Sequence, residues 1–327
     1  MSSRGSGRLA AVLAALLAGA LLLAGCGSAG EPPNLAPHVQ AQRPTPANAE
    51  VSPEIDSVGS VSEDCGDPTA SLRPKNGLAT PPGSTMAEIK KRGILRVGVD
   101  QNTFLFGFRN PTTGNLEGFD IAIAREIAKA LFGDPDRVRF KAITSQQRID
   151  VLRDGTVDVV VRTMTINCER REQIEFSSVY FVAGQRVLVT KRSGYSGLAD
   201  LAGKKVCATT GSTSLRNIAA ADSEPIPVAV ENWSDCLVLL QQGQVEAIST
   251  DDTILAGMAQ QDPTTHVVGP KFTNEPYGVG IPKEDTDLVR YVNAVLQQVR
   301  KNTWQAVYDR WIEPALGPGT PPEPTYK

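Results

Sequence analysis

Beyond the N-terminal part of the chain, short apolar runs alternate with segments of helical spacing, and this alternation limits the folds that the chain can adopt. The apolar run GILRVGVD is followed by a helical segment that we expect to begin at Asp120, as its N-cap, and to stop at Gly133. A strand near 138–143 and a helix over about 146–153 come next. Strands that alternate with helices predict α/β layers with a mostly parallel sheet.

One pattern occurs twice and suggests two domains of similar construction. LRDGTVDVVV and LQQGQVEAIS both show the end of a helix, a glycine, and then an apolar strand. We expect Gly155 and Gly243 to be left-handed C-caps of the two helices. The C-terminal part predicts two amphipathic helices that are split near Asn302, and a loose Pro-rich tail after Leu316.

Polar clusters follow several predicted strands, at the edge where α/β sheets bind ligands. These clusters are SQQR, RTMTINCERR, TTGSTS and TDD. The earlier clusters carry arginines and the last one carries Asp251, while the expected helix start at Gly211 adds N–H donors for an anion. A ligand with carboxylates and one ammonium group would satisfy this set, because arginine grips a carboxylate with two hydrogen bonds.

The sequence carries none of the common catalytic signatures. The chain has no G-x-S-x-G or H-E-x-x-H motif, and ATTGSTS lacks the lysine of a phosphate-binding loop. We therefore expect a binding protein without cofactor or metal rather than an enzyme.

The N-terminal residues predict export and a membrane anchor. Arg4 and Arg8 precede an apolar run, and the run ends in Leu-Ala-Gly-Cys, which looks like a bacterial lipobox. We expect residues 1–25 to be a lipoprotein signal peptide and Cys26 to carry lipid, which places the protein on the outer face of the cytoplasmic membrane. Residues 26–85 contain ten prolines and no regular period, so we expect a flexible spacer.

Four cysteines follow the anchor, and an even number in an exported chain favours disulfides. Of the three possible connectivities we expect Cys207–Cys236, which joins a strand to a nearby helix, and Cys65–Cys168, which attaches the end of the spacer to the folded body. A zinc site is disfavoured, because there is no C-x-x-C pair and both histidines are far from the cysteines.

The charge of the chain gives no reason to expect nucleic acid as a partner. Removal of the signal peptide takes away two arginines and leaves 31 basic and 36 acidic residues, a net charge of −5. A mildly acidic surface has no field that attracts a polyanion. We expect a monomer.

At the clusters above, the sequence resembles the bacterial extracytoplasmic solute-binding proteins for polar amino acids, which serve ABC importers. The resemblance covers about residues 86–313 and rests on several motifs in order: RVGVD, GNLEGFDIAIAREIA, TSQQRI, DGTVDVVVRTMTINCERREQIEFS, LADLAGKKVCATTGSTS, QGQVEAISTDD and EPYGVGI. It is greatest to actinobacterial lipoproteins that bind glutamate or glutamine. It implies a type II periplasmic-binding-protein fold of two α/β lobes joined by two strands.

The resemblance also assigns lobes and partners. Lobe 1 would comprise residues 86–182 and 281–327, and lobe 2 would comprise residues 186–276. The ligand would bridge the lobes and favour hinge closure, and the closed protein would deliver it to the permease of an ABC importer. Two alternatives stay open: a sensory membrane protein as the partner, and a dehydratase of prephenate type on the same fold.

The family's site residues carry over onto this chain as follows. Arg170, in T-x-x-x-x-R, matches the clamp for the α-carboxylate, with Thr165 and Thr163 beside it. Asp251 matches the acid that binds the α-ammonium. The remaining matches are listed by role: second-lobe donors Gly211, Ser212 and Thr213, aromatic wall Phe104, and readers of a side-chain carboxylate Ser145 and Arg148.

Two residues bear on ligand choice. Arg148 favours an acidic ligand, glutamate or aspartate, over glutamine or asparagine. Arg162 stands where the family usually has a small residue, so it is either a further side-chain ligand or the partner of a local acid. We expect Arg171, in contrast, to face solvent.

Overall fold

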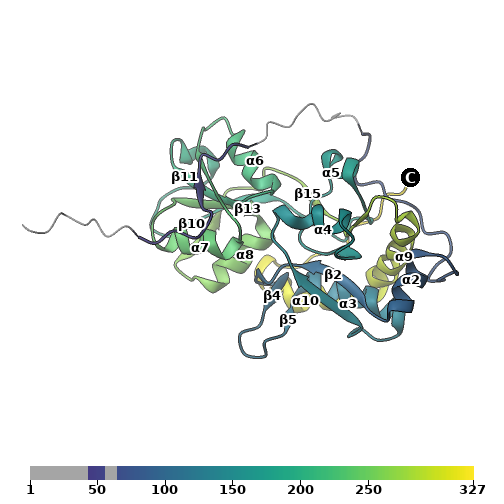
Figure 1. The fold of residues 1–327 in the computed structure, drawn as a ribbon. Coiled ribbons are helices and arrows are strands. Elements are labelled where there is room, and N and C mark those ends of the chain that lie inside the picture. Colours follow the sequence, from purple (N-terminus) through teal and green to yellow (C-terminus); the bar gives the residue numbers. More distant parts are fainter. Residues whose placement is uncertain (1–42, 56–64) are drawn as a thin grey trace, which may run out of the picture. The chain divides into compact units, whose positions relative to one another are not determined.

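Two β-sheets, each with helices packed against it, form the two lobes of the computed structural model, which describes residues 43–55 and 65–327. In Figure 1 lobe 1 is blue, teal and yellow, and lobe 2 is green. The predicted signal peptide and Cys26 lie outside the described residues. The mixed α/β architecture predicted from the sequence is confirmed.

The sheet of lobe 1 has five strands in the order β6-β2-β7-β16-β8. Its first three strands are parallel, and β16 runs antiparallel to its neighbours β7 and β8. The strands are β2 (Leu95–Val99), β6 (Val138–Ala142), β7 (Val159–Val160), β8 (Ile174–Phe176) and β16 (Gly280–Pro282). A small antiparallel sheet lies beside it, formed by β3 (Asn102–Thr103), β4 (Gly107–Arg109) and β5 (Leu116–Glu117).

Helices bury an apolar stripe on each face of the lobe 1 sheet, and two hydrophobic clusters result. The larger cluster packs α3 and α9 against the sheet, because both helices carry apolar residues at helical spacing. The helices of this lobe are α2 (Thr85–Arg92), α3 (Phe119–Phe132), η1 (Gln146–Arg148), α4 (Asp150–Arg153), α5 (Cys168–Gln173), α9 (Thr286–Asn302), α10 (Trp304–Trp311) and α11 (Glu313–Leu316).

The sheet of lobe 2 has six strands in the order β1-β12-β11-β13-β10-β14. Its strands are β1 (Glu50–Val51), β10 (Gln185–Thr190), β11 (Lys205–Thr209), β12 (Ile226–Val230), β13 (Ala247–Asp251) and β14 (Thr265–Val268), and its helices are η2 (Leu198–Leu201), α6 (Thr213–Ala219), α7 (Trp233–Gln241) and α8 (Asp252–Gln261). The central strand β13 is buried along its whole length, and β11 is buried after Lys205, as expected for strands that helices cover on both faces.

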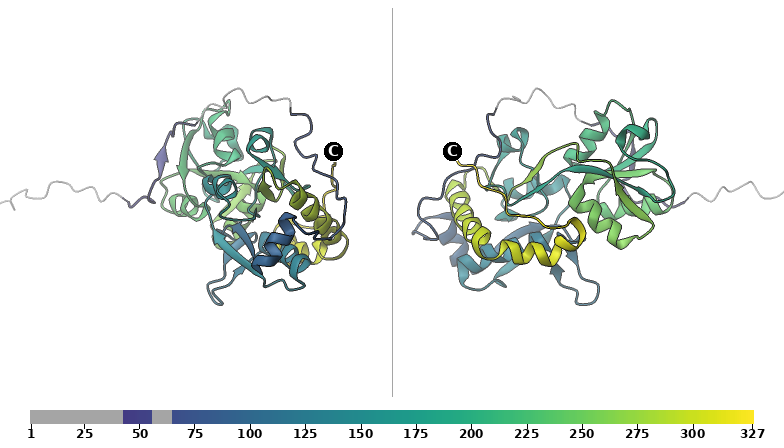
Figure 2. Two further views of the ribbon diagram at one scale, coloured as in Figure 1. Left: turned by 45° about the vertical axis from the view of Figure 1, so that its right-hand side comes forward. Right: turned by 180° about the vertical axis from the view of Figure 1, so that it is seen from behind.

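Two short strands connect the lobes. Strands β9 (Phe181–Ala183) and β15 (Glu275–Tyr277) pair antiparallel in a sheet of their own, and each continues into strands of both lobes along the chain. Figure 2 shows this crossing from behind, between the two lobes. A hinge of two paired strands permits one lobe to rotate against the other.

The N-terminal segment is not a free spacer in its described part. Strand β1 pairs antiparallel with β12 and adds an edge strand to lobe 2. Further along, Ser71 is fully buried and donates its hydroxyl to the carbonyl of Phe176 in lobe 1, at 2.7 Å. The expectation of a spacer over 26–85 therefore requires correction here, because backbone pairing and local burial hold a Pro-rich segment that has no helical or strand period.

The expectation of a loose C-terminal tail is also wrong. Ser71 donates its backbone N–H to Thr325 and accepts one from Lys327. Arg300 donates to the carbonyl of Pro322, and Gln297 donates to the hydroxyl of Tyr326. Prolines exclude regular structure but leave carbonyl acceptors free, and the tail uses them against α9.

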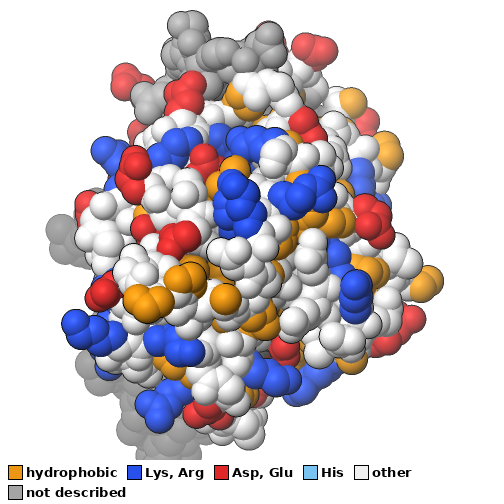
Figure 3. All heavy atoms as spheres, turned by 90° about the vertical axis from the view of Figure 1, so that its right-hand side faces the viewer, with side chains coloured by type: hydrophobic (Ala, Val, Ile, Leu, Met, Phe, Trp, Pro, Cys, Tyr) orange, Lys and Arg blue, Asp and Glu red, His pale blue; other side chains and the backbone are white. Residues whose placement is uncertain are grey.

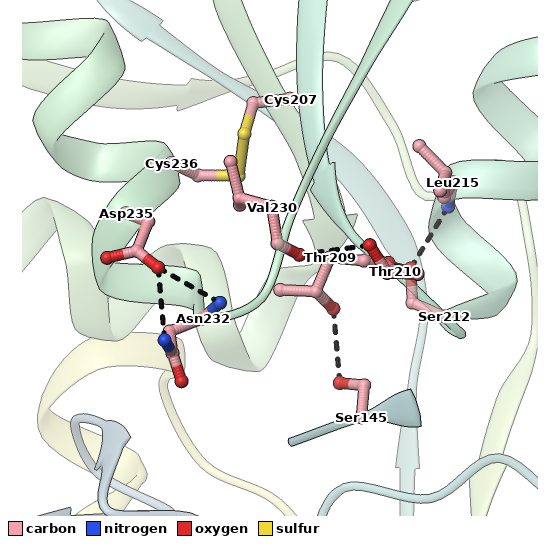
Figure 4. Close-up of a disulfide and its surroundings, with 10 residues drawn as sticks. All are labelled: Ser145, Cys207, Thr209, Thr210, Ser212, Leu215, Val230, Asn232, Asp235 and Cys236. Carbon is pink, nitrogen blue, oxygen red and sulfur yellow. Dashed lines mark hydrogen bonds between the residues drawn. A yellow bond between two sulfur atoms is a disulfide. The ribbon is translucent and has the colours of Figure 1, made fainter. Parts of the chain in front are cut away.

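The two predicted disulfides are confirmed. Cys207 on β11 is bonded to Cys236 on α7, and Cys65 is bonded to Cys168 at the start of α5. Figure 4 shows the first of these beside the helix start of α7. The Cα atoms lie 5.6 and 5.7 Å apart, within the usual range for a disulfide.

Helix ends agree with the sequence in part. Gly155 and Gly243 have φ of 62° and 64°, so both are left-handed as predicted, but each lies one residue beyond the C-cap, which is Asp154 in α4 and Gln242 in α7. Asp120 is not the N-cap of α3, however, because Gly118 holds that position with φ of 123°. Asp120 lies inside the first turn, where its carboxylate accepts from the hydroxyl of Tyr180 and from the backbone N–H of Thr163.

The surface of lobe 1 mixes charges of both signs. Figure 3 shows basic, acidic and apolar side chains interspersed on the face that lies to the right in Figure 1. Over residues 43–55 and 65–327, no helix is both long and apolar enough to cross a membrane. In the same part of the chain, no group of three His, Cys, Asp or Glu side chains is placed to hold a metal ion.

Candidate functional site

Polar loops at the ends of β6, β7, β11 and β13 meet between the two lobes and enclose a small cavity, which we call the inner cavity. Its volume is about 10 Å³, roughly the space of one water molecule. The residues that line it are Ser145, Arg148, Thr163, Thr165, Arg170, Ser212, Thr213, Ser214, Trp233, Thr250, Asp251 and Ile254. A molecule larger than water does not fit into the inner cavity at this separation of the lobes.

Most of the candidate residues named from the sequence lie together at this cavity. Those that line it are Arg170, Asp251, Arg148, Thr165, Thr163, Ser145, Ser212 and Thr213. Gly211 lines the larger space outside it. Phe104 and Arg162 line neither space, while Ser214, Trp233, Thr250 and Ile254 line the inner cavity without having been predicted.

Two guanidinium groups converge on one oxygen atom. Arg148 and Arg170 both donate from Nη2 to the carbonyl oxygen of Gly211, at 3.0 and 3.3 Å. Both arginines belong to lobe 1, on η1 and α5, and the carbonyl belongs to lobe 2. Two positive groups that aim at a single acceptor form a geometry suited to a carboxylate.

Burial disfavours the charged forms of Arg148 and Arg170, and a bound anion would offset this cost. Burial, and then the neighbouring charges of Arg170 and Arg162, hold the pKa of Arg148 well below its usual range. Burial and the charge of Arg216 lower the pKa of Arg170 to about 10. Both groups therefore favour a negative partner in the cavity.

Asp251 supplies an acceptor at the lobe 2 side of the same cavity. Its side chain is only 4% exposed, and the hydroxyl of Tyr277 donates to its Oδ2. Its Oδ1 is buried and has no hydrogen-bond partner among the described residues. Burial, followed by the nearby charge of Glu275, raises the pKa of Asp251 to about 8.

Glu275 is a buried carboxylate of the site that the sequence did not indicate. It lies on the connecting strand β15, and its Oε2 accepts from the hydroxyls of Thr165 and Thr213, at 2.5 and 3.0 Å. These hydroxyls come from different lobes, so Glu275 fixes both walls of the cavity. Its partners are 110 and 62 residues away, so the motif EPYGVGI, which begins at Glu275, did not reveal that this residue belongs to the site.

The backbone is strained at Thr163. Its φ is +38°, a conformation that a β-branched residue rarely adopts. The carboxylate of Asp120 accepts its N–H at 2.9 Å, and Arg148 donates to its carbonyl at 3.3 Å. Contacts on both sides of the peptide hold this conformation at the wall of the cavity.

Arg162 has a local acidic partner, which is one of the two alternatives that the sequence left open. It forms an ion pair with Asp100 at 2.8 Å and is 1% exposed. It also donates to the hydroxyl of Ser145 at 2.7 Å, and to the carbonyl of Ile143 at 2.8 Å. Ser145 lines the inner cavity and Arg162 does not, so Arg162 holds the hydroxyl of Ser145 in place without contacting the cavity itself.

One other expectation is wrong. Arg171 does not face solvent: it is buried, pairs with Glu175 at 2.8 Å and donates to the carbonyl of Pro68. The half-buried ring of Phe104 packs against the lobe 1 core and meets Phe108 edge-on, with 4.7 Å between centroids, and its role as an aromatic wall of the cleft stays a prediction.

A larger space, the outer chamber, opens beside the inner cavity. It has a volume of about 420 Å³ and shares Ser145, Arg148, Arg170 and Ser212 with the inner cavity. The N-terminal segment lines it through Glu50 and residues 53–55.

Further side-chain contacts join the two lobes around these spaces. Arg216 of lobe 2 pairs with Glu169 of lobe 1, and Thr209 donates to Ser145 at 3.1 Å (Figure 4). A Cβ atom on Gly211, which has φ of +75°, would lie 2.8 Å from Cα of Gln146. Only glycine permits this approach of the lobes.

Two lobes that close on a cavity with buried arginines and a buried carboxylate define a binding protein for a small charged solute. The model of the bacterial extracellular solute-binding proteins, family 3, matches residues 95–314. The chain belongs to this family, as the sequence predicted, and its structural relatives confirm the predicted two-lobed fold.

Similar proteins include the ABC transporter glutamine-binding protein GlnH of Bacillus subtilis, which is 40% identical over 70% of this chain and 85% of its own. The glutamate-binding protein GluB of Corynebacterium efficiens is 31% identical over 64% and 75% of the two chains. Among solved structures, the solute receptor for L-cysteine of Neisseria gonorrhoeae superposes with a TM-score of 0.68, at 26% identity, and covers 72% of this chain and 96% of its own.

Proposed function

We propose that this chain captures free amino acids with acidic side chains, glutamate and aspartate, outside the cytoplasmic membrane and delivers them to the permease of an ABC importer. The ligand would lie between the lobes and stabilise the closed form. Lipid on Cys26 would hold the protein at the membrane. Relatives named for glutamine and glutamate binding support the ligand class but do not rank its members.

The convergence of Arg148 and Arg170 on the carbonyl oxygen of Gly211 carries this proposal. A carboxylate would replace that neutral acceptor with a charged one, and charge-assisted hydrogen bonds are the stronger kind. The unpartnered Oδ1 of Asp251 would accept the α-ammonium across the same cavity. Carboxylate and ammonium groups in one small molecule define an amino acid.

Arg148 supports an acidic side chain over an amide. A guanidinium only donates hydrogen bonds, so it satisfies a carboxylate better than an amide, whose NH₂ group also donates. We expect the mature chain to be stabilised most by glutamate or aspartate in a thermal-shift screen of the twenty amino acids. At a concentration one hundred times Kd, binding adds about 2.7 kcal/mol, or roughly 5–10 °C in Tm.

The screen distinguishes two kinds of failure. Stabilisation by glutamine alone would reject the acidic ligand and keep the amino-acid-binding function. No shift with any amino acid, confirmed by calorimetry, would reject the function itself.

We also expect affinity to rise with pH between about 6 and 8. Asp251 has a pKa of about 8 in the closed protein, so its carboxyl group is mostly protonated at pH 7. An ammonium ligand requires the ionised form, so binding releases a proton, and affinity increases by up to tenfold per pH unit until the pKa is passed. Isothermal calorimetry at pH 6, 7 and 8 measures this slope.

The control is Asp251→Asn, which removes the titrating group. Other charged groups act on Asp251 from neighbouring elements, namely Glu275, Asp252 and Arg148. Asp120 has a pKa of about 7 but contacts Tyr180 and Thr163 instead. A slope that persists in Asp251→Asn would assign the proton to another group and contradict this prediction.

A further inference from the structure

Two buried polar atoms among the residues of the inner cavity have no hydrogen-bond partner in the described part of the chain. One is Oδ1 of Asp251, an acceptor, and the other is Nε1 of Trp233, a donor. Native proteins contain few buried polar atoms without partners, because each has lost its hydration without compensation. An acceptor and a donor at one cavity therefore point to a ligand that supplies both partners.

Local structure fixes the position of Trp233. It is the first residue of α7, directly after Asn232, whose side chain and that of Asp235 form a capping box (Figure 4). The disulfide of Cys236 follows within the same turn of the helix. The Trp233 side chain is 3% exposed and packs in the core of lobe 2, so its N–H cannot turn to bulk water in the closed protein.

The chemistry of the indole N–H limits what it can bind. It only donates, carries no charge and keeps a fixed direction on a rigid ring. The resemblance to the family assigns the α-carboxylate of the ligand to Arg170, and the proposed function assigns its ammonium group to Asp251. The polar group that remains to meet Trp233 is an oxygen atom of the ligand side chain.

We infer that Trp233 donates its Nε1–H to a side-chain oxygen of the bound amino acid and, together with Arg148, determines which side chains are accepted. This inference rests on the proposed function. Both residues line the inner cavity. The side chains of arginine and tryptophan donate hydrogen bonds and contain no acceptor atom. A side chain with two acceptor oxygens satisfies both, whereas an apolar side chain leaves the indole N–H unpaired.

The first test compares L-glutamate with L-norvaline, which has a methyl group in place of the side-chain carboxylate. Trp233→Phe keeps an aromatic ring in the core and removes the N–H. We expect calorimetry, with norvaline measured by competition, to show that the variant binds glutamate about tenfold or more weakly and binds norvaline as the wild type does. Equal losses for both ligands would indicate a packing role and overturn the inference, as would no loss for either.

The second test needs no stable variant at the site. The chain has three tryptophans, and Trp304 already donates its Nε1–H to the carbonyl of Tyr180, at 2.9 Å. In ¹H–¹⁵N spectra, glutamate should move the indole proton of Trp233 downfield more than norvaline does, and should leave that of Trp304 nearly unchanged. Trp311→Phe, in the C-terminal helix α10, assists the assignment.

An indole signal of Trp233 that responds equally to both ligands would overturn the inference even if Trp233→Phe fails to fold. A wild-type chain that binds no amino acid would instead overturn the proposed function. The two failures are therefore distinguishable.

Discussion

Replacement of Arg170 with alanine is expected to lower the affinity for the amino-acid ligand by a hundredfold or more. The guanidinium is buried, donates to Thr165 at 2.7 Å and points at the oxygen position occupied by the carbonyl of Gly211. Loss of one partner of a buried charge pair costs about 2–5 kcal/mol, and each 1.4 kcal/mol is tenfold in Kd. Calorimetry with glutamate gives the measurement.

The adjacent Arg171 offers a matched control. It is also buried and charged, but it pairs with Glu175 and lines neither the inner cavity nor the outer chamber. Arg171→Ala should lower Tm while it leaves the affinity for glutamate within about threefold, since no ligand contact is lost. Near-native affinity in Arg170→Ala would remove Arg170 from the site.

Replacement of Arg162 with methionine is expected to destabilise the protein by about 3–5 kcal/mol. The substitution leaves the carboxylate of Asp100 buried without its cation, although Thr103 still donates to it at 2.7 Å. Breaking one side of a buried ion pair costs more than the pair itself contributes, because the remaining charge has lost its hydration. Urea denaturation followed by circular dichroism measures the loss.

Two variants isolate the cause of this loss. Arg162→Met combined with Asp100→Asn should recover part of the stability, because no unpaired charge is left. Arg137→Met breaks an exposed pair with Asp134 and should cost less than about 1 kcal/mol. A large fall in glutamate affinity at unchanged stability would show instead that Arg162 contacts the ligand.

Much of the fold follows from signals that are local in the chain. Alternation of strands and helices, and the glycines at positions 155 and 243, act within a few residues, so they can be recognised before any contact is known. The disulfide between Cys207 and Cys236 spans 29 residues and joins a strand to a neighbouring helix, which made it accessible to the same reasoning.

The remainder depends on contacts between distant segments. Glu275 belongs to the site only because Thr165 and Thr213 approach it from two lobes. Arg171 is buried because residues near Pro68 cover it. Helix α5 has only six residues, so its pattern could not show that a distant segment packs over this side chain. Sequence patterns place a side chain on its own element, and the packing of other elements decides what it contacts.

Each disulfide ends beside a loop that carries site residues. Cys168 begins α5, which holds Arg170, while Cys207 and Cys236 lie on β11 and α7, next to the turn at Gly211 and to Trp233. Cross-links that restrict these loops reduce the ordering that binding requires. A newly made chain in a reducing cytoplasm has neither cross-link. The site therefore reaches its full preorganisation only when both cross-links are formed.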